Sequence, residues 1–238
     1  MSTHRIHVPD LPSTGDLLIT GEEAHHAARV KRLREGERVE IHDGRGGVGV
    51  AAIAAIRKHS AEWEMVVRLE SRERRPRELP VLHVLAAAPK GERLHDMIDG
   101  LSQVGAASWS PLVSERTVVE PREGKLGRLA RVAGESMKQC GRAWVLEIGP
   151  MVRFDAAMAR PRIVVADASG EDYRRTGSEE ITLLVGPEGG WSAGEVNGLR
   201  DAGALIARFG RHVMRTEVAA VVAAGVVMLA ERPEAGVS

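Results

Sequence analysis

The chain has 238 residues, of which 43% are hydrophobic and 3% are aromatic. This length suits two small domains or one large one, and the apolar fraction excludes a wholly disordered chain. The 33 Lys and Arg residues balance 33 Asp and Glu residues, so the net charge gives no indication of a polyanionic partner.

The N-terminal part of the sequence predicts a small β-rich domain. Its apolar patterns predict strands over residues 5–8, 38–41, 48–56 and 63–69, and a helix over residues 21–33. Gly44, Gly46 and Gly49 match the spacing of a dinucleotide-binding fingerprint, which must open a helix after a strand. Because these glycines lie between two β-patterned runs, we interpret them as a hairpin turn.

A charged, proline-bearing stretch, Ser71–Pro80, separates this part from the rest of the chain. Its lack of apolar residues predicts an interdomain linker. We therefore expect a first domain over residues 1–72, a linker over residues 73–80 and a second domain over residues 81–238.

The second domain alternates apolar runs with helical patterns, which predicts a mostly parallel sheet with helices on both faces. The predicted strands cover residues 81–87, 109–113, 163–166, 181–185 and 205–207. The predicted helices cover residues 92–104, 125–141, 192–202 and 216–230.

Two loops of this domain carry candidate binding residues. Gly186–Gly190 follows an apolar strand and precedes a helix that Ser192 and Glu195 begin with a capping box. Glycines in such a loop let a ligand approach main-chain N–H groups. The loop Phe209–Arg215 links another strand to the last helix, which we expect Thr216 to cap. Both loops are expected at the carboxyl edge of the sheet, where open α/β folds bind ligands.

The helix predicted over residues 125–141 has a basic face opposite its apolar stripe. Along that face, spaced by three or four residues, lie Arg128, Arg131, Glu135, Lys138 and Arg142. A phosphate-facing patch and an ordinary solvated helix face both fit this pattern. Cys140, the single cysteine, falls on the apolar stripe and is expected to be a small core residue.

The sequence also bears on compartment and on metals. No apolar run reaches the roughly 20 residues that a membrane span needs, and no signal peptide is evident, so we expect a cytoplasmic protein. One cysteine and the adjacent His25 and His26 do not match the ligand spacing of a zinc site, and no bound metal is expected.

Five ordered stretches of the sequence resemble the RsmE family, the bacterial 16S rRNA uridine-N3 methyltransferases of the SPOUT superfamily. These stretches are His25–Gly46, Pro111–Pro121, Gly134–Arg142, Leu183–Val196 and Phe209–Ala220. They keep the family's order and similar gaps over His4–Ala230. The resemblance implies methylation of N3 of a uridine in the 16S rRNA of the 30S subunit, with S-adenosylmethionine as the methyl donor.

The resemblance also implies a fold and an assembly. The first domain would be a PUA-like β-barrel that binds RNA. The second would be an α/β domain tied in a deep trefoil knot, a feature too rare for periodicity to indicate. The protein would be a homodimer.

Site residues are carried over from matching positions. Those implied to bind the cofactor are Asp167, Ala168, Gly186, Pro187, Glu188, Gly189, Gly190, Phe209, Gly210, Met214, Arg215 and Thr216. Those implied to face RNA are Arg29, Arg32, Arg116, Lys138, Gln139 and Arg142. As catalytic groups we predict Arg215, which would stabilise the uracil anion, and Glu188, a candidate proton acceptor alongside Glu217.

The chain departs from the family pattern at Leu101 and Gln103, where Lys and Glu often stand, and at Val218, where the family usually has Thr. Two alternatives stay open: a SPOUT methyltransferase acting on another RNA such as tRNA, and a non-catalytic RNA-binding assembly factor, for which these departures leave room.

Overall fold

A computed structural model describes residues 4–59 and 62–233. The chain divides into two compact units, Met1–Arg77 with Met137–Val145, and Glu78–Ser136 with Leu146–Ser238. The second segment of the first unit, Met137–Val145, was not expected from the sequence. Strand β5 (Glu62–Arg74) also extends into the stretch expected as a linker.

The first unit is built on a mixed sheet. Among the described residues it has five strands in the order β1-β3-β4-β5-β2, with β1 parallel to β3 and the other pairs antiparallel. The bounds are β1 (His4–His7), β2 (Gly15–Ile19), β3 (Arg38–His42) and β4 (Gly47–His59). Helix α1 (Gly21–His25) continues as a π-helical turn over His26–Val30. The predicted helix is thus in place but shorter, and β2 was not predicted.

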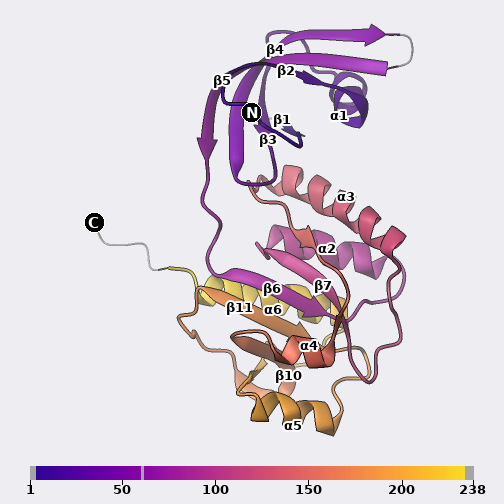
Figure 1. Cartoon of the computed structure of the whole chain (residues 1–238), viewed down its shortest axis with the longest axis vertical. Coiled ribbons are helices and arrows are strands. Elements are labelled where there is room, and N and C mark those ends of the chain that lie inside the picture. Colours follow the sequence, from indigo (N-terminus) through magenta and orange to yellow (C-terminus); the bar gives the residue numbers. More distant parts are fainter. Residues whose placement is uncertain (1–3, 60–61, 234–238) are drawn as a thin grey trace. The chain divides into compact units, whose positions relative to one another are not determined.

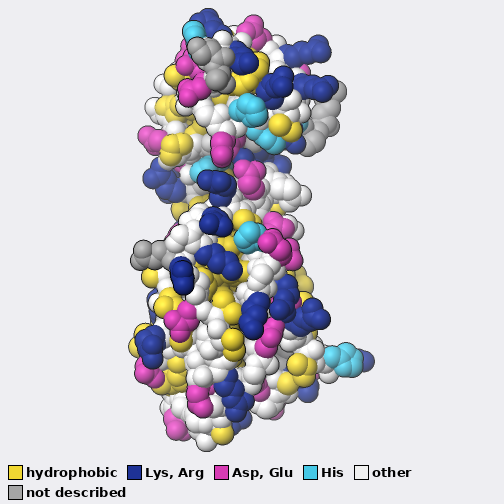
Figure 2. Space-filling view, turned by 90° about the vertical axis from the view of Figure 1, so that its right-hand side faces the viewer, with side chains coloured by type: hydrophobic (Ala, Val, Ile, Leu, Met, Phe, Trp, Pro, Cys, Tyr) yellow, Lys and Arg dark blue, Asp and Glu magenta, His cyan; other side chains and the backbone are white. Residues whose placement is uncertain are grey.

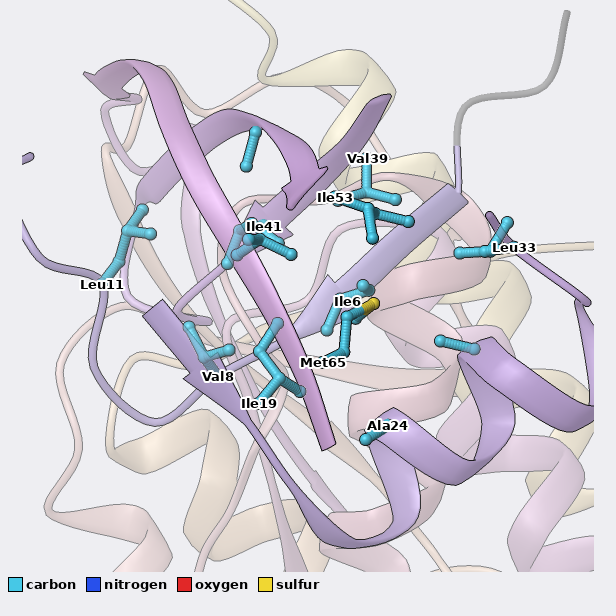
Figure 3. Packing of buried hydrophobic residues seen from close by; sticks show 13 residues of the cluster. Ile6, Val8, Leu11, Ile19, Ala24, Leu33, Val39, Ile41, Ile53 and Met65 are labelled. Atoms are coloured by element: carbon cyan, nitrogen blue, oxygen red, sulfur yellow. The ribbon is translucent and has the colours of Figure 1, made fainter. Parts of the chain in front are cut away.

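Alternate residues of these strands form the core of the first unit. Val39 and Ile41 of β3 are buried, whereas Arg38 is exposed, as a strand with one buried face requires. Figure 3 shows them packed with Ile53 of β4 and Met65 of β5. A single apolar cluster therefore holds this sheet together.

The glycine-rich segment between β3 and β4 is a hairpin turn, as predicted. Gly44 and Gly46 have positive φ angles of 68° and 95°. A Cβ atom at Gly46 would lie 2.7 Å from the ring of Trp144 and 2.8 Å from the carbonyl oxygen of Arg75. Close packing within this unit, rather than nucleotide binding, therefore explains glycine at position 46.

The second unit contains a parallel sheet, which confirms the α/β architecture predicted for the second domain. Its seven strands in the described part of the chain follow the order β12-β10-β11-β6-β7-β8, with β9 paired to β7. All their recorded pairings are parallel. The bounds are β6 (Val81–Ala86), β7 (Ser108–Val113), β8 (Glu147–Ile148), β9 (Val152–Arg153), β10 (Ile163–Asp172), β11 (Glu180–Val185) and β12 (Leu205–Arg208).

Helices cover both faces of this sheet, as predicted. Their bounds are α2 (Arg93–Gln103), α3 (Glu123–Cys140), α4 (Phe154–Met158), α5 (Ala193–Asp201) and α6 (Thr216–Ala230). Helix α6 packs against α2 and against β6 and β11, while α4 and α5 contribute to an apolar cluster with other strand residues (Figure 1). Strands β8 and β9 and helix α4 were not predicted. No helix within the described ranges is long and apolar enough to cross a membrane.

Cys140 is exposed, so the expectation that it is a core residue is wrong. Leu129, Ala133 and Met137 of the same helix are buried, and the apolar stripe therefore exists. Cys140 is the last residue of α3, and its thiol lies 3.7 Å from the carbonyl oxygen of Met137. Helical spacing identified the buried face but not the residue at which burial ends.

Candidate functional site

Three loops meet at the carboxyl edge of the second unit's sheet and enclose a cavity of about 270 Å³. Two of them follow the parallel strands β11 and β12, and the third is an irregular segment within the adjacent strand β10. Most of the residues predicted to bind the cofactor line this cavity, namely Asp167, Ala168, Gly186, Pro187, Glu188, Gly190, Phe209, Gly210, Met214 and Thr216. Gly189 and Arg215 are not in this wall, and Gly189 lines a neighbouring cavity.

The loop after β11 is a tight turn that leads into α5. The N–H of Gly190, whose φ is 67°, donates a hydrogen bond to the carbonyl oxygen of Pro187 at 2.8 Å. The Ser192 hydroxyl then accepts from the N–H of Glu195, and the Glu195 carboxylate accepts from the N–H of Ser192. The predicted capping box is therefore confirmed, and it fixes the point at which the loop ends.

The loop after β12 is tied to the loop after β11. Arg215, not Thr216, is the N-cap residue of α6, and it makes no side-chain capping bond. The prediction that Thr216 caps the helix is wrong, because its hydroxyl donates to the carbonyl oxygen of Gly186 at 3.3 Å. That bond joins two cavity walls. The Arg215 side chain is exposed, and the described part of the chain offers it no recorded partner.

The third wall is an irregularity within β10. The pairing of β10 with β12 shifts register between Ala166 and Glu171, so the residues between them leave the ladder. Within this bulge the Asp167 carboxylate accepts from both the N–H and the hydroxyl of Ser169, at 2.9 Å and 2.6 Å. A Cβ atom at Gly170 would collide with the backbone of Ile206, so the bulge lies closely against β12.

Arg93, at the start of α2, joins two of the acidic residues at this edge. Its guanidinium lies 2.8 Å from the Glu188 carboxylate in the loop after β11 and 3.6 Å from the Glu217 carboxylate in the first turn of α6. Glu217 is only 8% exposed. We did not identify Arg93 from the sequence, because no local pattern connects it with partners about a hundred residues away.

A second group behind the cavity was also missed. The ring of Tyr173 stacks on that of Phe209, with centroids 5.2 Å apart, and Phe209 lines the cavity. The Tyr173 hydroxyl donates to the buried Glu231 carboxylate at 2.6 Å, and that carboxylate also accepts from the backbone N–H groups of Thr176 and Gly177. The residue just after α6 thereby holds the aromatic pair in place.

Glu231 is expected to make stability depend on pH. Burial raises its pKa, but hydrogen bonds from Tyr173, Thr176 and Gly177 outweigh burial and hold the pKa below its ordinary value. Because the folded pKa is depressed, the stabilisation is present above the unfolded pKa and is lost as pH falls through the folded pKa. We expect Glu231→Gln to lower the free energy of unfolding by about 1–3 kcal/mol at pH 7 and by much less in acid. Urea unfolding at both pH values measures this, and an equal loss at both would contradict it.

The predicted RNA-facing residues divide into two groups. Arg29 and Arg32 in the first unit are exposed, as is Gln139. Arg116 is exposed, and its guanidinium donates to the carbonyl oxygens of Gly189 and Trp191 at 2.8 Å and 3.4 Å.

Lys138 and Arg142 differ from expectation. The Lys138 ammonium lies 2.5 Å from the Glu23 carboxylate, and the Lys138 side chain is only 11% exposed. Arg142 is 8% exposed. The Lys138 side chain is therefore paired with a residue of the first unit, and the Arg142 side chain is buried; contact of either residue with RNA remains a prediction. On the face that Figure 2 presents, Lys and Arg side chains lie among Asp and Glu side chains, so positive and negative charges are mixed on this face.

Comparison with known proteins shows which families the two parts of the chain resemble. Residues 77–228 match the RNA methyltransferase domain, and residues 19–64 match the RNA methyltransferase PUA domain. The ribosomal RNA small subunit methyltransferase E of Mycobacterium bovis is 31% identical, over 98% of this chain and 94% of that protein.

Two solved structures share the fold. A Legionella pneumophila methyltransferase in complex with SAM has a TM-score of 0.83 and 26% identity, over 97% of this chain and 98% of that one. The ribosomal RNA small subunit methyltransferase E of Neisseria gonorrhoeae, bound to S-adenosyl methionine, has a TM-score of 0.82 and 22% identity, over 94% and 96% of the two chains.

The matched domain, together with a parallel sheet and a cavity at its carboxyl edge, is that of an RNA methyltransferase. More specifically, the chain belongs to the ribosomal RNA small subunit methyltransferase E family. The family resemblance recognised in the sequence is thereby confirmed.

Proposed function

We propose that this protein transfers a methyl group from S-adenosylmethionine to N3 of a uridine in the 16S rRNA of the small ribosomal subunit. The observation that carries the proposal is the cavity built from the β10, β11 and β12 loops in a chain that matches this family over nearly its whole length. The proposed substrate is cytoplasmic, and we place the enzyme there.

The residues of the cavity suit S-adenosylmethionine. Phe209 and Met214 offer apolar surface for a purine ring, and the glycine loop exposes main-chain groups for polar atoms. The carboxylates of Asp167 and Glu188 also line the cavity and complement a positively charged donor. When bound there, the cofactor supplies an electrophilic methyl group on a sulfonium sulfur. We propose Gly189 and Arg215 as further contacts at the rim, since each adjoins a lining residue.

The chain's own groups would prepare the base. N3 of uridine carries a proton that must leave before N3 can attack. We propose that Glu188 accepts this proton and that the exposed guanidinium of Arg215 stabilises the resulting anion. Holding the base in line with the methyl group supplies a further, entropic gain. The target uridine would leave its stack to reach the cavity.

We propose a trefoil knot in the second unit, which comprises most of the expected domain over residues 81–238. Strand β12 lies at one edge of the sheet, yet α6 packs on β6 and β11 further in. The segment between β12 and α6 would therefore run past the loop that follows β11. The hydrogen bond from the Thr216 hydroxyl to the carbonyl oxygen of Gly186 supports this path, because it joins the start of α6 to that loop.

We propose that the domain expected over residues 1–72 is a PUA-like barrel that binds RNA, with residues 73–80 as the linker. The match over residues 19–64 and the five-stranded sheet of the described residues support this. Arg29, Arg32 and Arg116 are our candidates for contact with RNA phosphates, which favour exposed cations, and the exposed amide of Gln139 is a candidate for a hydrogen bond to RNA.

We propose a homodimer that covers the exposed face of α6. Apolar residues follow this face at spacings of four, four and three, namely Val218, Val222, Val226 and Leu229, and all but Val222 are exposed, Leu229 to 74%. An apolar helix face of this kind is typical of an interface between subunits.

The double variant Val226→Glu, Leu229→Glu is expected to be monomeric, because it places charges in the centre of that interface. Light scattering measures the mass. The matched control is Met151→Glu, since Met151 is an exposed apolar residue outside α6. An unchanged dimer in the double variant would contradict this interface.

Methyl transfer to RNA tests the proposed function. Tritium-labelled S-adenosylmethionine is incubated with the protein and with 30S subunits, 50S subunits or tRNA. We expect label in the 30S rRNA. Label in tRNA would replace the proposal with a different substrate, and cofactor binding without transfer to any RNA would reduce the protein to a binding factor.

A further inference from the structure

A second, smaller cavity adjoins the cofactor cavity. Its volume is about 60 Å³, and it shares Pro187, Glu188 and Thr216 with the wall of the larger one. Its other walls come from the segment after β6, Ala87–Lys90, and from the segment Arg116–Val119 after β7. Whatever occupies it lies beside the occupant of the larger cavity.

The walls of the smaller cavity suit a flat, neutral ring with carbonyl groups. Ala87, Ala88 and Pro89 are buried and give it an apolar side. Thr117 and Thr216 also line it, with the Thr117 hydroxyl bonded to Ser114 and the Thr216 hydroxyl bonded to the carbonyl oxygen of Gly186. Apolar faces accept a ring, and polar groups at the edge fix its orientation.

Two cations line this cavity, and they differ in how they are held. Arg116 donates to the carbonyl oxygens of Gly189 and Trp191, so its guanidinium is part of the wall. Lys90 is exposed, and its ammonium has no recorded ion pair or hydrogen bond to the residues that the structure describes. Lys90 is therefore the cation that a ligand in this cavity meets. Arg215, proposed above as a stabilising cation, adjoins the larger cavity through Met214 and Thr216 but does not line the smaller one, so Lys90 would act in addition to it.

We propose that the smaller cavity receives the uracil base of the target nucleotide and that Lys90 is a catalytic residue that stabilises the base as its N3 is deprotonated. The proposal rests on the proposed function. N3 gives its proton to the Glu188 carboxylate, which lines both cavities. The N3 electron pair forms the new N–C bond while the C–S bond breaks and its electron pair stays on sulfur. The transient negative charge of the ring lies on N3 and the two carbonyl oxygens, within reach of the Lys90 ammonium.

Lys90→Ala tests the role of the cation. The rate of methyl transfer to 30S subunits is expected to fall by about 10- to 100-fold, less than for a fully enclosed donor because Lys90 is exposed. The pH profile of the rate is expected to shift to higher pH, because without the cation a higher pH is needed to deprotonate N3 of the uracil. The dissociation constant for S-adenosylmethionine, measured by calorimetry, is expected to stay unchanged. Lys90→Arg should recover part of the rate, and the control Arg200→Ala, an exposed residue of α5, should keep it.

Filling each cavity separates the two ligands. Ala88→Leu fills the smaller cavity and is expected to abolish transfer while S-adenosylmethionine still binds. Ala168→Leu fills the larger cavity and is expected to abolish cofactor binding itself. Thermal melting confirms that each variant folds.

Wild-type transfer rates in either Lys90→Ala or Ala88→Leu, with an unchanged pH profile, would overturn the inference and leave the proposed function intact. A wild-type protein that binds S-adenosylmethionine yet methylates no 30S rRNA would contradict the proposed function, and the inference would fall with it.

Discussion

Replacing Gly186 with alanine is expected to weaken S-adenosylmethionine binding by at least about tenfold, because small displacements of a binding loop have large effects. A Cβ atom at this position would lie 2.9 Å from the indole ring of Trp191. That ring is 8% exposed and lies 5.9 Å from the ring of Phe154, so it has little room to move. The loop that carries Gly186 must shift instead, and this loop is a wall of the cofactor cavity.

Gly194→Ala is the matched control. This glycine lies eight residues further on, in the first turn of α5, and a Cβ atom there meets its nearest neighbour, the Ser192 hydroxyl, at 3.9 Å. We expect unchanged cofactor binding and a gain in stability of up to about 1 kcal/mol, since alanine favours helix more than glycine does. Titration calorimetry compares both variants with the wild type. Equal affinity in Gly186→Ala would show that the loop is not part of the binding site.

Arg93→Ala is expected to destabilise the protein by about 2 kcal/mol, between the values typical of exposed and buried ion pairs. The variant leaves the Glu217 carboxylate, which is 8% exposed, without the cation 3.6 Å away. It also releases the Glu188 carboxylate from a contact of 2.8 Å. Because Glu188 lines both cavities, the rate of methyl transfer at 25 °C should fall by more than the loss of folded protein alone would explain.

A double-mutant cycle isolates the contribution of Glu217. Adding Glu217→Gln to Arg93→Ala removes the uncompensated buried charge and is expected to restore about half of the lost stability. Urea unfolding gives the four free energies. If the two substitutions proved simply additive, the ion pair would not be what joins α2 to the first turn of α6.

Patterns local in the sequence predicted the parts of the site that are local in the structure. The capping box of Ser192 and Glu195 follows from hydrogen bonds between residues three apart, and the structure shows both bonds. The apolar strands β10 and β11 were recognised because strands buried on both faces leave continuous apolar runs, whereas the edge strand β12 offered only a short apolar run. Loops that follow adjacent parallel strands must meet at one edge of the sheet, so their proximity could be predicted.

Contacts between distant residues could not be predicted in this way. Tyr173 and Glu231 are 58 positions apart, and each alone resembles an ordinary surface residue. The ion pair of Lys138 could not be foreseen for the same reason. Helical spacing places this lysine on the basic face of α3, but Glu23, far away in the sequence, neutralises it and removes it from solvent. Charge patterning shows which face of a helix is polar, not whether another segment already covers that face.

The order of strands explains why one sheet edge holds the whole candidate site. β11 lies between β10 and β6, so the loop after it separates the two cavities and contributes Pro187 and Glu188 to both. A donor in one cavity and an acceptor base in the other would then lie side by side where the two cavities adjoin at Pro187 and Glu188, as direct transfer requires.

Nucleoside mass spectrometry after reaction tests the central claim most directly. Unmethylated 30S subunits are incubated with the protein and S-adenosylmethionine, and the 16S rRNA is digested and analysed. We expect 3-methyluridine to appear at a single position, at close to one per subunit. A methylated nucleoside other than 3-methyluridine, or none in the presence of bound cofactor, would contradict the account.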